Sequence, residues 1–363
     1  MAAKDNIVLE SDFSFKAFQN RLMLGTEIST SLLNNNINDG IITKEEFEDD
    51  YGSNLPFDPK KFESILIINE NIQPFKLGRG NLAFRIFMRT MFKQNFFNIS
   101  YSEIGTSYNA LATSSLKQDE RKISINDNMY LWKNRIILGL GINYSYDNIS
   151  SQKESTTGTA NYNINFVIRP DYLPVWNFNF SKTASSNDAS KNPIDQTTGT
   201  FSTGISYKVM NIPFSPTTFT LRYNLFDYSD NTSSNKLKRN TLSLNSKSEF
   251  QSLPLVISGN YSFSKNDYKM VKDQMSDFTS FGLKADFVLF EKKMKPFISL
   301  KLSTFDGDID QQFVQHYAIG TGYNILTNTY ISCDFSLKTY SNNDNNIENF
   351  RRTAGKVRIV QKF

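Results

Sequence analysis

The chain has 363 residues, which is enough for one large domain or two ordinary ones. Hydrophobic residues make up 39% of it, and the formal net charge of +4 is not gathered into a basic block that would indicate nucleic-acid binding. No apolar run approaches the roughly 18 residues of a membrane-spanning helix. Cys333 is the single cysteine, so an internal disulfide is excluded.

The composition favours strands over helices. The chain contains 31 Phe and 17 Tyr, against one Cys and one His. Aromatic residues are enriched in β-strands. A mean hydropathy of −0.43 is compatible with a membrane protein of this kind. In a transmembrane β-barrel only alternate residues of each strand face lipid, and polar loops lower the average further.

Residues 1–17, which begin "MAAKDNIVLESDFS", are interpreted as an N-terminal periplasmic or linker segment. They lack the basic region and the apolar region of a secretory signal. For an exported protein this predicts either a trimmed chain or the C-terminal part of a longer one. Sustained alternation begins only after this segment, with Leu22, Leu24 and Ile28 on one face and Glu27 on the other.

Residues 34–80 interrupt the alternation. The stretches "ITKEEFEDDYG" and "DPKKFESILIINENIQPF" contain charges and prolines, and Thr43 is a plausible N-cap for one short helix. We interpret this segment as a long extramembrane insertion.

From Leu82 onward the alternation is almost unbroken. In "TANYNINFVIRPDYLPVWNFNFS", Tyr162, Ile164 and Phe166 are separated by asparagines, and the pattern returns at Trp176 after a break bounded by prolines. A period of two is that of a β-strand with one apolar and one polar face.

The connections between these strands predict the architecture. Short ones such as "PDYLPV" and "FEKKMK" alternate with longer, Asn- and Ser-rich ones such as "NISSQKESTTG" and "YSDNTSSNK". Short periplasmic turns and long extracellular loops are typical of outer-membrane barrels. Counted from Phe18, there are about sixteen strands (roughly 14 to 18), and bacterial single-chain barrels have an even number. We therefore predict an all-β fold, a closed antiparallel transmembrane β-barrel over residues 18–363.

The physical reason is the absence of water in the hydrocarbon layer. A spanning sheet must pair every backbone N–H and C=O, so it closes on itself, with an apolar exterior and a polar lumen. The alternative is a soluble sandwich, whose apolar faces pack together and whose edge strands are protected. Nearly every strand carries the same apolar face and no protected edge stands out, which favours the barrel.

The last residues, "GKVRIVQKF", resemble the C-terminal signature of bacterial outer-membrane β-barrel proteins, with Phe363 at the end and Gln361 departing from the usual apolar residue. The stretch from "NLAFRIFMRT" to "RIILGLGINY" is similar to barrel strands of uncharacterised outer-membrane proteins from Bacteroidota-like lineages. These resemblances imply a bacterial outer-membrane location, contact with outer-membrane lipid, and recognition of the last strand by the barrel assembly machinery. TonB-dependent receptors share the barrel, but this chain has no plug and fewer than their roughly 22 strands.

Catalytic chemistry has few residues to use. A histidine-dependent enzyme would require His316, the single histidine, and no nucleophile motif or paired-acid spacing accompanies it. "DGDID" at Asp306 does not match a calcium loop, and Cys333 lies on the predicted lipid face. We predict no enzymatic activity, no cofactor and no metal site.

The predicted lumen is basic, and inward acids such as Glu27, Asp286 and Asp334 are fewer than inward bases. If the basic side chains line a water-filled channel, their field favours anions. The alternative is that they form ladders with one another and with the inward acids, or that they fill the lumen. The lumen-facing candidates are Arg21, Arg85, Arg89, Arg135, Arg169, Lys208, Arg222, Lys284, Lys301 and Lys338, together with Lys247.

The function predicted first is a porin-like channel or transporter for small hydrophilic solutes, because about sixteen strands enclose an aqueous channel unless something fills it. The alternative is a barrel that anchors surface loops or a further N-terminal domain, for adhesion or assembly or as part of a TonB-type receptor. The sequence leaves the solute and the oligomeric state open.

Overall fold

The computed structural model describes most of the chain, in two compact units. The described residues are 3–51, 58–65, 67–73, 79–110, 117–210, 215–250, 252–269, 273–290, 293–307, 311–326, 329–342 and 349–361. Unit 1 comprises residues 1–129, 139–162 and 183–195, and unit 2 comprises residues 130–138, 163–182 and 196–363.

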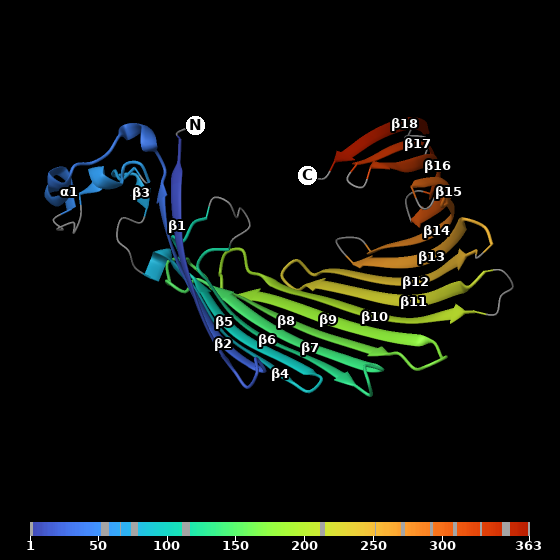
Figure 1. The fold of residues 1–363 in the computed structure, drawn as a ribbon, viewed down its shortest axis with the longest axis horizontal. Helices are drawn as coiled ribbons and strands as arrows, with labels where there is room; N and C mark the ends of the chain where they lie inside the picture. The colour runs from blue at the N-terminus through green and yellow to red at the C-terminus, as the bar shows by residue number, and fades with distance from the viewer. Residues whose placement is uncertain are drawn as a thin grey trace. The chain divides into compact units, whose positions relative to one another are not determined.

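Most of the described residues belong to β-strands that follow one another along the chain (Figure 1). The strands are β1 (Asp5–Ala17), β2 (Leu22–Asn34), β3 (Ile72–Gln73), β4 (Leu82–Phe92), β5 (Asn95–Ile104), β6 (Glu120–Leu131), β7 (Ile136–Asp147), β8 (Thr157–Ile168), β9 (Val175–Asn187), β10 (Asp195–Val209), β11 (Thr217–Asp230), β12 (Asn235–Glu249), β13 (Leu255–Lys269), β14 (Asp273–Phe287), β15 (Met294–Gly307), β16 (Gln311–Leu326), β17 (Thr329–Asn342) and β18 (Phe350–Gln361). The one α-helix of the described residues is α1 (Lys44–Tyr51), and short 3-10 helices span Ile37–Asp39, Pro59–Phe62 and Arg79–Asn81. The predicted all-β antiparallel class is confirmed.

Strand β1 corrects the interpretation of residues 1–17 as a linker. All 13 of its residues pair with β2, from Asp5 opposite Asn34 to Ala17 opposite Leu22. With β1 included, the described residues contain seventeen strands longer than two residues, and sixteen of them begin at Leu22 or later.

Two short turns share one sequence pattern and one backbone shape. Phe18–Asn20 and Trp132–Asn134 all have φ between 50° and 67°, and an arginine follows each triplet. The N–H of Arg21 donates to the carbonyl oxygen of Phe18 (3.2 Å), and that of Arg135 to Trp132 (3.1 Å). Asparagine tolerates this left-handed region better than most residues. The side chains of Phe18 and Trp132 are 75% and 77% exposed.

The segment between β2 and β4 holds the buried hydrophobic cluster of the described residues. Ile68 and Ile72 are its centre, and Ile7, Leu32 and Ile42 pack against them. The cluster packs this insertion against the N-terminal end of β1 and the C-terminal end of β2. The existence of a structured interruption between strands was predicted, and its position outside a membrane stays a prediction.

The helix α1 begins where the sequence places its cap. The hydroxyl of Thr43 accepts from the N–H of Glu46 (3.2 Å), while the carboxylate of Glu46 accepts from the N–H of Thr43 (2.8 Å). This reciprocal pair is a capping box, so the predicted N-cap is confirmed. The hydrogen bond from the Thr43 backbone lowers the pKa of the Glu46 carboxyl from its usual range.

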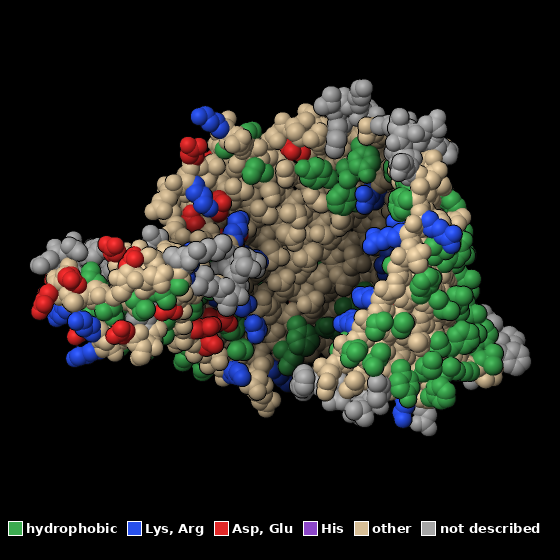
Figure 2. Space-filling model, turned by 90° about the horizontal axis from the view of Figure 1, so that it is seen from above, with side chains coloured by type: hydrophobic (Ala, Val, Ile, Leu, Met, Phe, Trp, Pro, Cys, Tyr) green, Lys and Arg blue, Asp and Glu red, His purple; other side chains and the backbone are tan. Residues whose placement is uncertain are grey.

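In unit 2, β10 to β18 form a continuous antiparallel ladder with a defined register at every step. Cross-strand partners share a face, so the register defines one apolar face and one polar face. The apolar face is uncovered within the unit, since Ile298, Ile319 and Phe335 are 55%, 57% and 51% exposed. Figure 2 shows hydrophobic side chains over one side of the wall at the right of the view, and Lys and Arg side chains along its other side.

The predicted contrast between short turns and long loops holds in unit 1 and, in unit 2, at the connection between β17 and β18 (residues 343–349), but it is wrong at three other connections of unit 2. In unit 1, residues 105–119, 148–156 and 188–194 are long connections. In unit 2, the corresponding connections are residues 231–234, 270–272 and 308–310. The polar residues read as loops belong instead to strands of up to 16 residues, longer than the roughly 9–11 that span a bilayer.

A glycine of β2 accommodates an aromatic ring on the polar face of unit 1. Gly25 is the cross-strand partner of Phe87, and a Cβ on Gly25 would overlap the Phe87 ring. The guanidinium carbons of Arg85 and Arg89 lie 5.3 Å and 4.6 Å from the centroid of that ring. The glycine therefore lets Phe87 lie flat and buried on the sheet, with a cation on either side.

We expect Gly25→Ala to lower the free energy of unfolding by about 1–3 kcal/mol, because the ring of Phe87 must leave its site. Urea unfolding of the detergent-solubilised protein, followed by tryptophan fluorescence, measures the change. Gly355→Ala is the matched control, because a Cβ at Gly355 meets no atom within 4 Å. The variant Gly25→Ala/Phe87→Leu should recover part of the loss, and equal effects of the two glycine substitutions would contradict the ring's role.

Candidate functional site

The polar face of unit 2 carries lysines on every second strand. Lys208 of β10 is level with Thr218, Lys247, Ser258 and Lys284, each the cross-strand partner of the one before. We call Lys208, Lys247 and Lys284 the lysine row. A hydroxyl residue separates neighbouring lysines, which keeps like charges two strands apart.

Acids two residues along the same strands compensate the lysine row. The Nζ of Lys247 is 2.6 Å from a carboxylate oxygen of Glu249, and that of Lys284 is 2.5 Å from Asp286. Residues i and i+2 of a strand share a face, so these pairs stay on the polar face. The lysine row is therefore largely neutralised within the wall.

The Gly–Phe arrangement of unit 1 recurs beside the lysine row. Phe297 of β15 is the cross-strand partner of Gly320 of β16, and a Cβ on Gly320 would come within 2.7 Å of the ring. The Nζ of Lys284 lies 4.9 Å from the Phe297 centroid. Both units thus seat a phenylalanine on a glycine and place a cation over its ring.

A second row on the same face carries four basic residues on four consecutive strands. Lys301 of β15 pairs with His316 of β16, His316 with Lys338 of β17, and Lys338 with Arg352 of β18. We call these four residues the basic row. No described acid forms an ion pair with any of them, in contrast to the lysine row.

On the polar face of unit 1, charge is balanced across strands. Glu27 of β2 is the direct partner of Arg85 of β4, and their side chains are 3.4 Å apart. Arg89 is two residues along β4 from Phe87 and shares its face. The polar face of unit 1 therefore pairs an acidic with a basic side chain, whereas the basic row contains basic side chains alone.

The structure divides the predicted lumen-facing residues into three groups. Lys208, Lys284, Lys301 and Lys338 lie in the two rows, Arg222 lies level with Gly204 and Ser243 on the same face, and Arg85 and Arg89 lie on the polar face of unit 1. Arg21, Arg135 and Arg169 lie outside the strands, in or beside the turns. Their placement corrects the prediction that they belong to the strand wall. The predicted assembly signal, Phe363, lies outside the described residues.

Sequence reasoning favoured His316 as a residue of the lumen wall over a catalytic one, and it passed over Arg352. His316 lies between two lysines instead of beside a carboxylate, so the described residues do not assemble a catalytic triad around it. Arg352, Lys356 and Arg358 occupy alternate positions of β18, on the polar face. The alternation in "FRRTAGKVRIVQ" is the sequence pattern that could have identified these basic residues.

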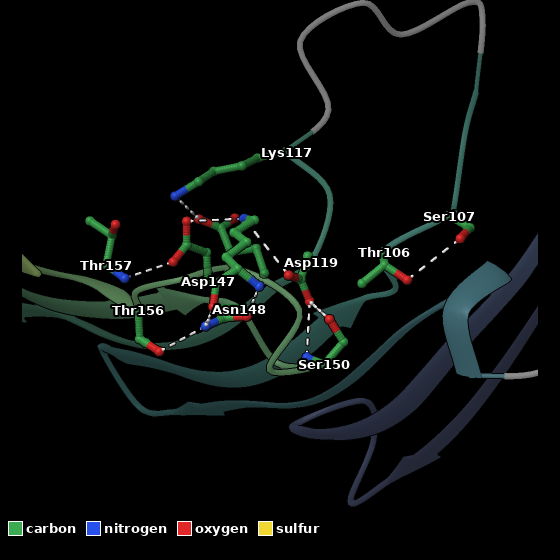
Figure 3. Close-up of polar contacts among 11 residues, drawn as sticks. Thr106, Ser107, Lys117, Asp119, Asp147, Asn148, Ser150, Thr156 and Thr157 are labelled. Atoms are coloured by element: carbon green, nitrogen blue, oxygen red, sulfur yellow. Dashed lines mark hydrogen bonds and ion pairs between the residues drawn. The ribbon is translucent and has the colours of Figure 1, made fainter. Parts of the chain in front are cut away.

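A polar cluster in unit 1 joins the connections after β5 and β7 (Figure 3). The carboxylate of Asp119 accepts from the N–H (3.2 Å) and hydroxyl (3.3 Å) of Ser150. Asp147 accepts from the N–H of Thr157 at 2.7 Å. The Nζ of Lys153 is 3.7 Å from Asp119 and 3.2 Å from Asp147, so one cation joins both acids. We call Asp119, Asp147, Ser150, Lys153 and Thr157 the loop cluster.

The loop cluster extends to a third connection. The N–H of Thr156 donates to Asp188, which follows β9, at 2.7 Å. Asn148 closes its own loop by donating to the carbonyl oxygen of Lys153 (3.1 Å) and accepting from its N–H (2.9 Å). Described residues from three connections of unit 1 are therefore joined by polar contacts.

The apolar face of unit 1 contains one shielded ion pair. Glu103 of β5 and Arg121 of β6 are cross-strand partners 3.0 Å apart, with side chains 4% and 25% exposed. Tyr101 donates to Glu103 (2.9 Å), and Arg121 donates to the hydroxyl of Tyr146. These contacts satisfy the buried polar atoms of the Glu103–Arg121 ion pair. The pair lies on the apolar face, where an unpaired charge would be most costly.

The described residues contain no group of three potential metal ligands. None of their helices has the length and apolar character needed to cross a membrane.

Comparison with known proteins gives similar solved structures. No family model and no curated protein matches the chain. It is similar to the outer membrane channel DcaP of Acinetobacter baumannii, at 8% identity and a TM-score of 0.44 over 78% of this chain and 85% of that one. It is also similar to a bacterial polysaccharide outer membrane secretin (10% identity, TM-score 0.39, 78% and 90% covered). A third similar structure is OmpT, an outer membrane protein of Vibrio cholerae (7%, 0.35, 74% and 89%).

The three similar structures named above are bacterial outer-membrane proteins. The resemblance predicted from the sequence is confirmed at this level. The narrower likeness to Bacteroidota-like proteins stays a prediction.

We expect Glu103→Gln to destabilise the protein by about 3–5 kcal/mol, because it leaves the Arg121 charge uncompensated on the apolar face. The matched control is Glu27→Gln, which breaks the Glu27–Arg85 pair, whose side chains are 37% and 36% exposed. Such an accessible pair contributes about 0–1 kcal/mol. Urea midpoints measure both changes, and Glu103→Gln/Arg121→Gln should recover stability. Equal losses in the two single variants would contradict the shielding argument.

Proposed function

We propose that this chain forms a closed β-barrel in a bacterial outer membrane and conducts small hydrophilic solutes through its lumen. The observation that carries the proposal is the uncovered apolar face of the long strands. Among the described residues of each unit, the large apolar side chains on this face have no second layer to pack against, and the buried cluster belongs to the insertion. A soluble protein does not leave such a surface in water, whereas lipid covers it.

Closure is supported by the first and last strands. Phe13 on β1 and Ile359 on β18 are each 67% exposed, against 45% for Leu221 on the inner strand β11 and 57% for Ile319 on the inner strand β16. Such exposure fits strands that each lack a neighbour on one side of their own ladder. Because hydrocarbon offers no hydrogen-bond partners, both edges require a strand in the membrane.

The number of strands determines whether the two edge strands pair in parallel or antiparallel. Seventeen strands that reverse direction at every connection leave β1 and β18 running the same way, so their pairing is parallel. The alternative is a sixteen-strand barrel closed by antiparallel pairing of β2 with β18. However, β2 already pairs with β1 on one edge and β4 on the other, so this alternative requires β1 to leave. We propose the parallel closure, which gives an odd number of strands and so departs from the even number usual in bacterial single-chain barrels.

Cysteine cross-linking distinguishes the two closures. In a Cys333→Ser background, Ser11→Cys is combined in turn with Arg351→Cys, Thr353→Cys and Gly355→Cys, all on apolar-face positions. We expect at least one pair to oxidise to an intramolecular disulfide, detected by mass spectrometry after proteolysis, because a disulfide needs Cα atoms within about 7 Å.

Two comparisons make the result decisive. Ser11→Cys with Ile28→Cys is the positive control, since these residues are cross-strand partners in β1 and β2. Thr26→Cys on β2, combined with the same three β18 positions, tests the sixteen-strand alternative. Cross-linking of β2 alone would replace our closure by that one, and cross-linking of neither strand to β18 would contradict closure.

A channel role is supported by the continuous polar face, because barrels of sixteen or more strands generally enclose an aqueous lumen. We expect the purified protein to give stable, ohmic conductance steps in planar bilayers. Heat-unfolded protein is the control for detergent-induced current. An inserted, folded protein that stays silent would contradict the channel.

The second candidate function, an anchor for surface loops, is favoured by the loop cluster. Three connections of unit 1 are held together by hydrogen bonds and ion pairs, as suits a surface that binds a partner. A silent but folded barrel would favour this role. For either function we propose that lipid contacts the apolar face and that the assembly machinery recognises the C-terminal strand.

A further inference from the structure

We propose that the basic row of Lys301, His316, Lys338 and Arg352 is a binding subsite for small oxyanions that carry two or more negative charges. The inference deepens the proposed channel function, on which its role in solute selection rests. The site itself lies on four consecutive strands of unit 2, and its geometry depends on no other part of the chain.

The register places the four residues level with one another. Each is the direct cross-strand partner of the next. Direct partners have Cβ atoms about 5 Å apart, and three strand spacings cover about 14 Å. An anion with one charge can neutralise one member of such a row, whereas an anion with two separated charges can bridge two strands.

No acid lies next to the basic row on its face. On one side the same strands carry Ser299, Ala318, Ser336 and Ala354, and on the other they carry Ser303, Val314, Tyr340 and Phe350. Beyond Lys301, its partner on β14 is Gly282. The small residues leave space above the sheet beside each basic side chain, and the hydroxyls add neutral donors.

The absence of neighbouring acids distinguishes the basic row from the lysine row. Lys247 and Lys284 each have an acid two residues away and in contact with them, and hydroxyl residues separate these lysines from one another. In the basic row the basic residues are adjacent and lack such acids. Lys338 and Arg352 are like charges placed directly opposite each other, an arrangement that destabilises a sheet. A bound polyanion removes that repulsion, which gives the row a reason to bind one.

The chemistry of the four side chains fits an oxyanion. Arg352 presents a planar fork that pairs with a carboxylate or phosphate through two parallel bonds. Lys301 and Lys338 present point charges on flexible stems, and His316 adds a ring N–H between them. Lys301, Lys338 and Arg352 are exposed, so an anion reaches them without rearrangement of the sheet.

Direct binding tests the site apart from transport. Isothermal titration of the full chain in detergent uses citrate and pyrophosphate as probes, with acetate as the singly charged comparison. We expect both polyanions to bind more tightly than acetate. In Lys301→Gln/Lys338→Gln/Arg352→Gln their affinity should fall at least about tenfold, the effect of losing one or two charge-assisted hydrogen bonds. Whichever of citrate and pyrophosphate binds more tightly identifies the carboxylate or the phosphate class.

Two variants separate specific binding from general charge. Lys284→Gln/Asp286→Asn removes a compensated pair from the same face at no change in net charge, and it should leave citrate affinity unchanged. Lys301→Arg/Lys338→Arg keeps the charge of the row and should retain binding. Equal affinity for acetate and citrate, or unchanged citrate affinity in the triple variant, would overturn the subsite. Loss of affinity in the Lys284 control to the same extent would also overturn it.

Conductance separates the subsite from the channel. In an open channel, citrate should block chloride current in the wild type and do so at least about tenfold less potently in the triple variant. Citrate binding by a protein that opens no channels keeps the subsite and removes the transport function. Stable conductance without citrate binding keeps the channel and removes the subsite.

Discussion

The structure depends on the pairing of backbone hydrogen bonds between neighbouring strands, because the strands have almost no other tertiary support. The apolar side chains of unit 2 lie on an uncovered face, so they do not hold the sheet together as a core does. Backbone pairing instead fixes the register of the strands, and the register determines which side chains are neighbours on the polar face. Two glycines, Gly25 and Gly320, show how closely side chains then follow that register, since each faces the one phenylalanine whose ring it admits.

Period-two alternation was sufficient to predict the fold class, because the apolar face of most strands is visible in a short window of sequence. It was not applied to β1, although Leu9, Phe13 and Phe15 alternate there with polar residues and only Ser11 interrupts the apolar face. The pairing with β2 is what identifies this strand. Alternation failed in unit 2, where polar stretches read as loops extend the strands. Local polarity does not separate a loop from the part of a strand that continues beyond an apolar layer.

The candidate site was predictable only in part. Alternation shows that Lys301 and Lys338 share a face, but it does not show that they are level with each other and with His316. That alignment depends on turn lengths and on the irregular register near Asn324 and Leu326. Arg21 and Arg135 were misplaced for a related reason. The alternation was extended into turns whose positive φ values end the strand, and no hydrophobic pattern reports that change.

The distribution of charge matters more than its sum. The chain carries a formal charge of only +4, and much of its basic character is compensated locally, as in the contacts of Lys247 and Lys284 with Glu249 and Asp286. In water such paired charges create little field a few ångströms away, because the two signs cancel and solvent screens the remainder. The basic row lacks that compensation. A nearly neutral chain can therefore still present one strongly positive patch, and the position of its acids determines where that patch lies.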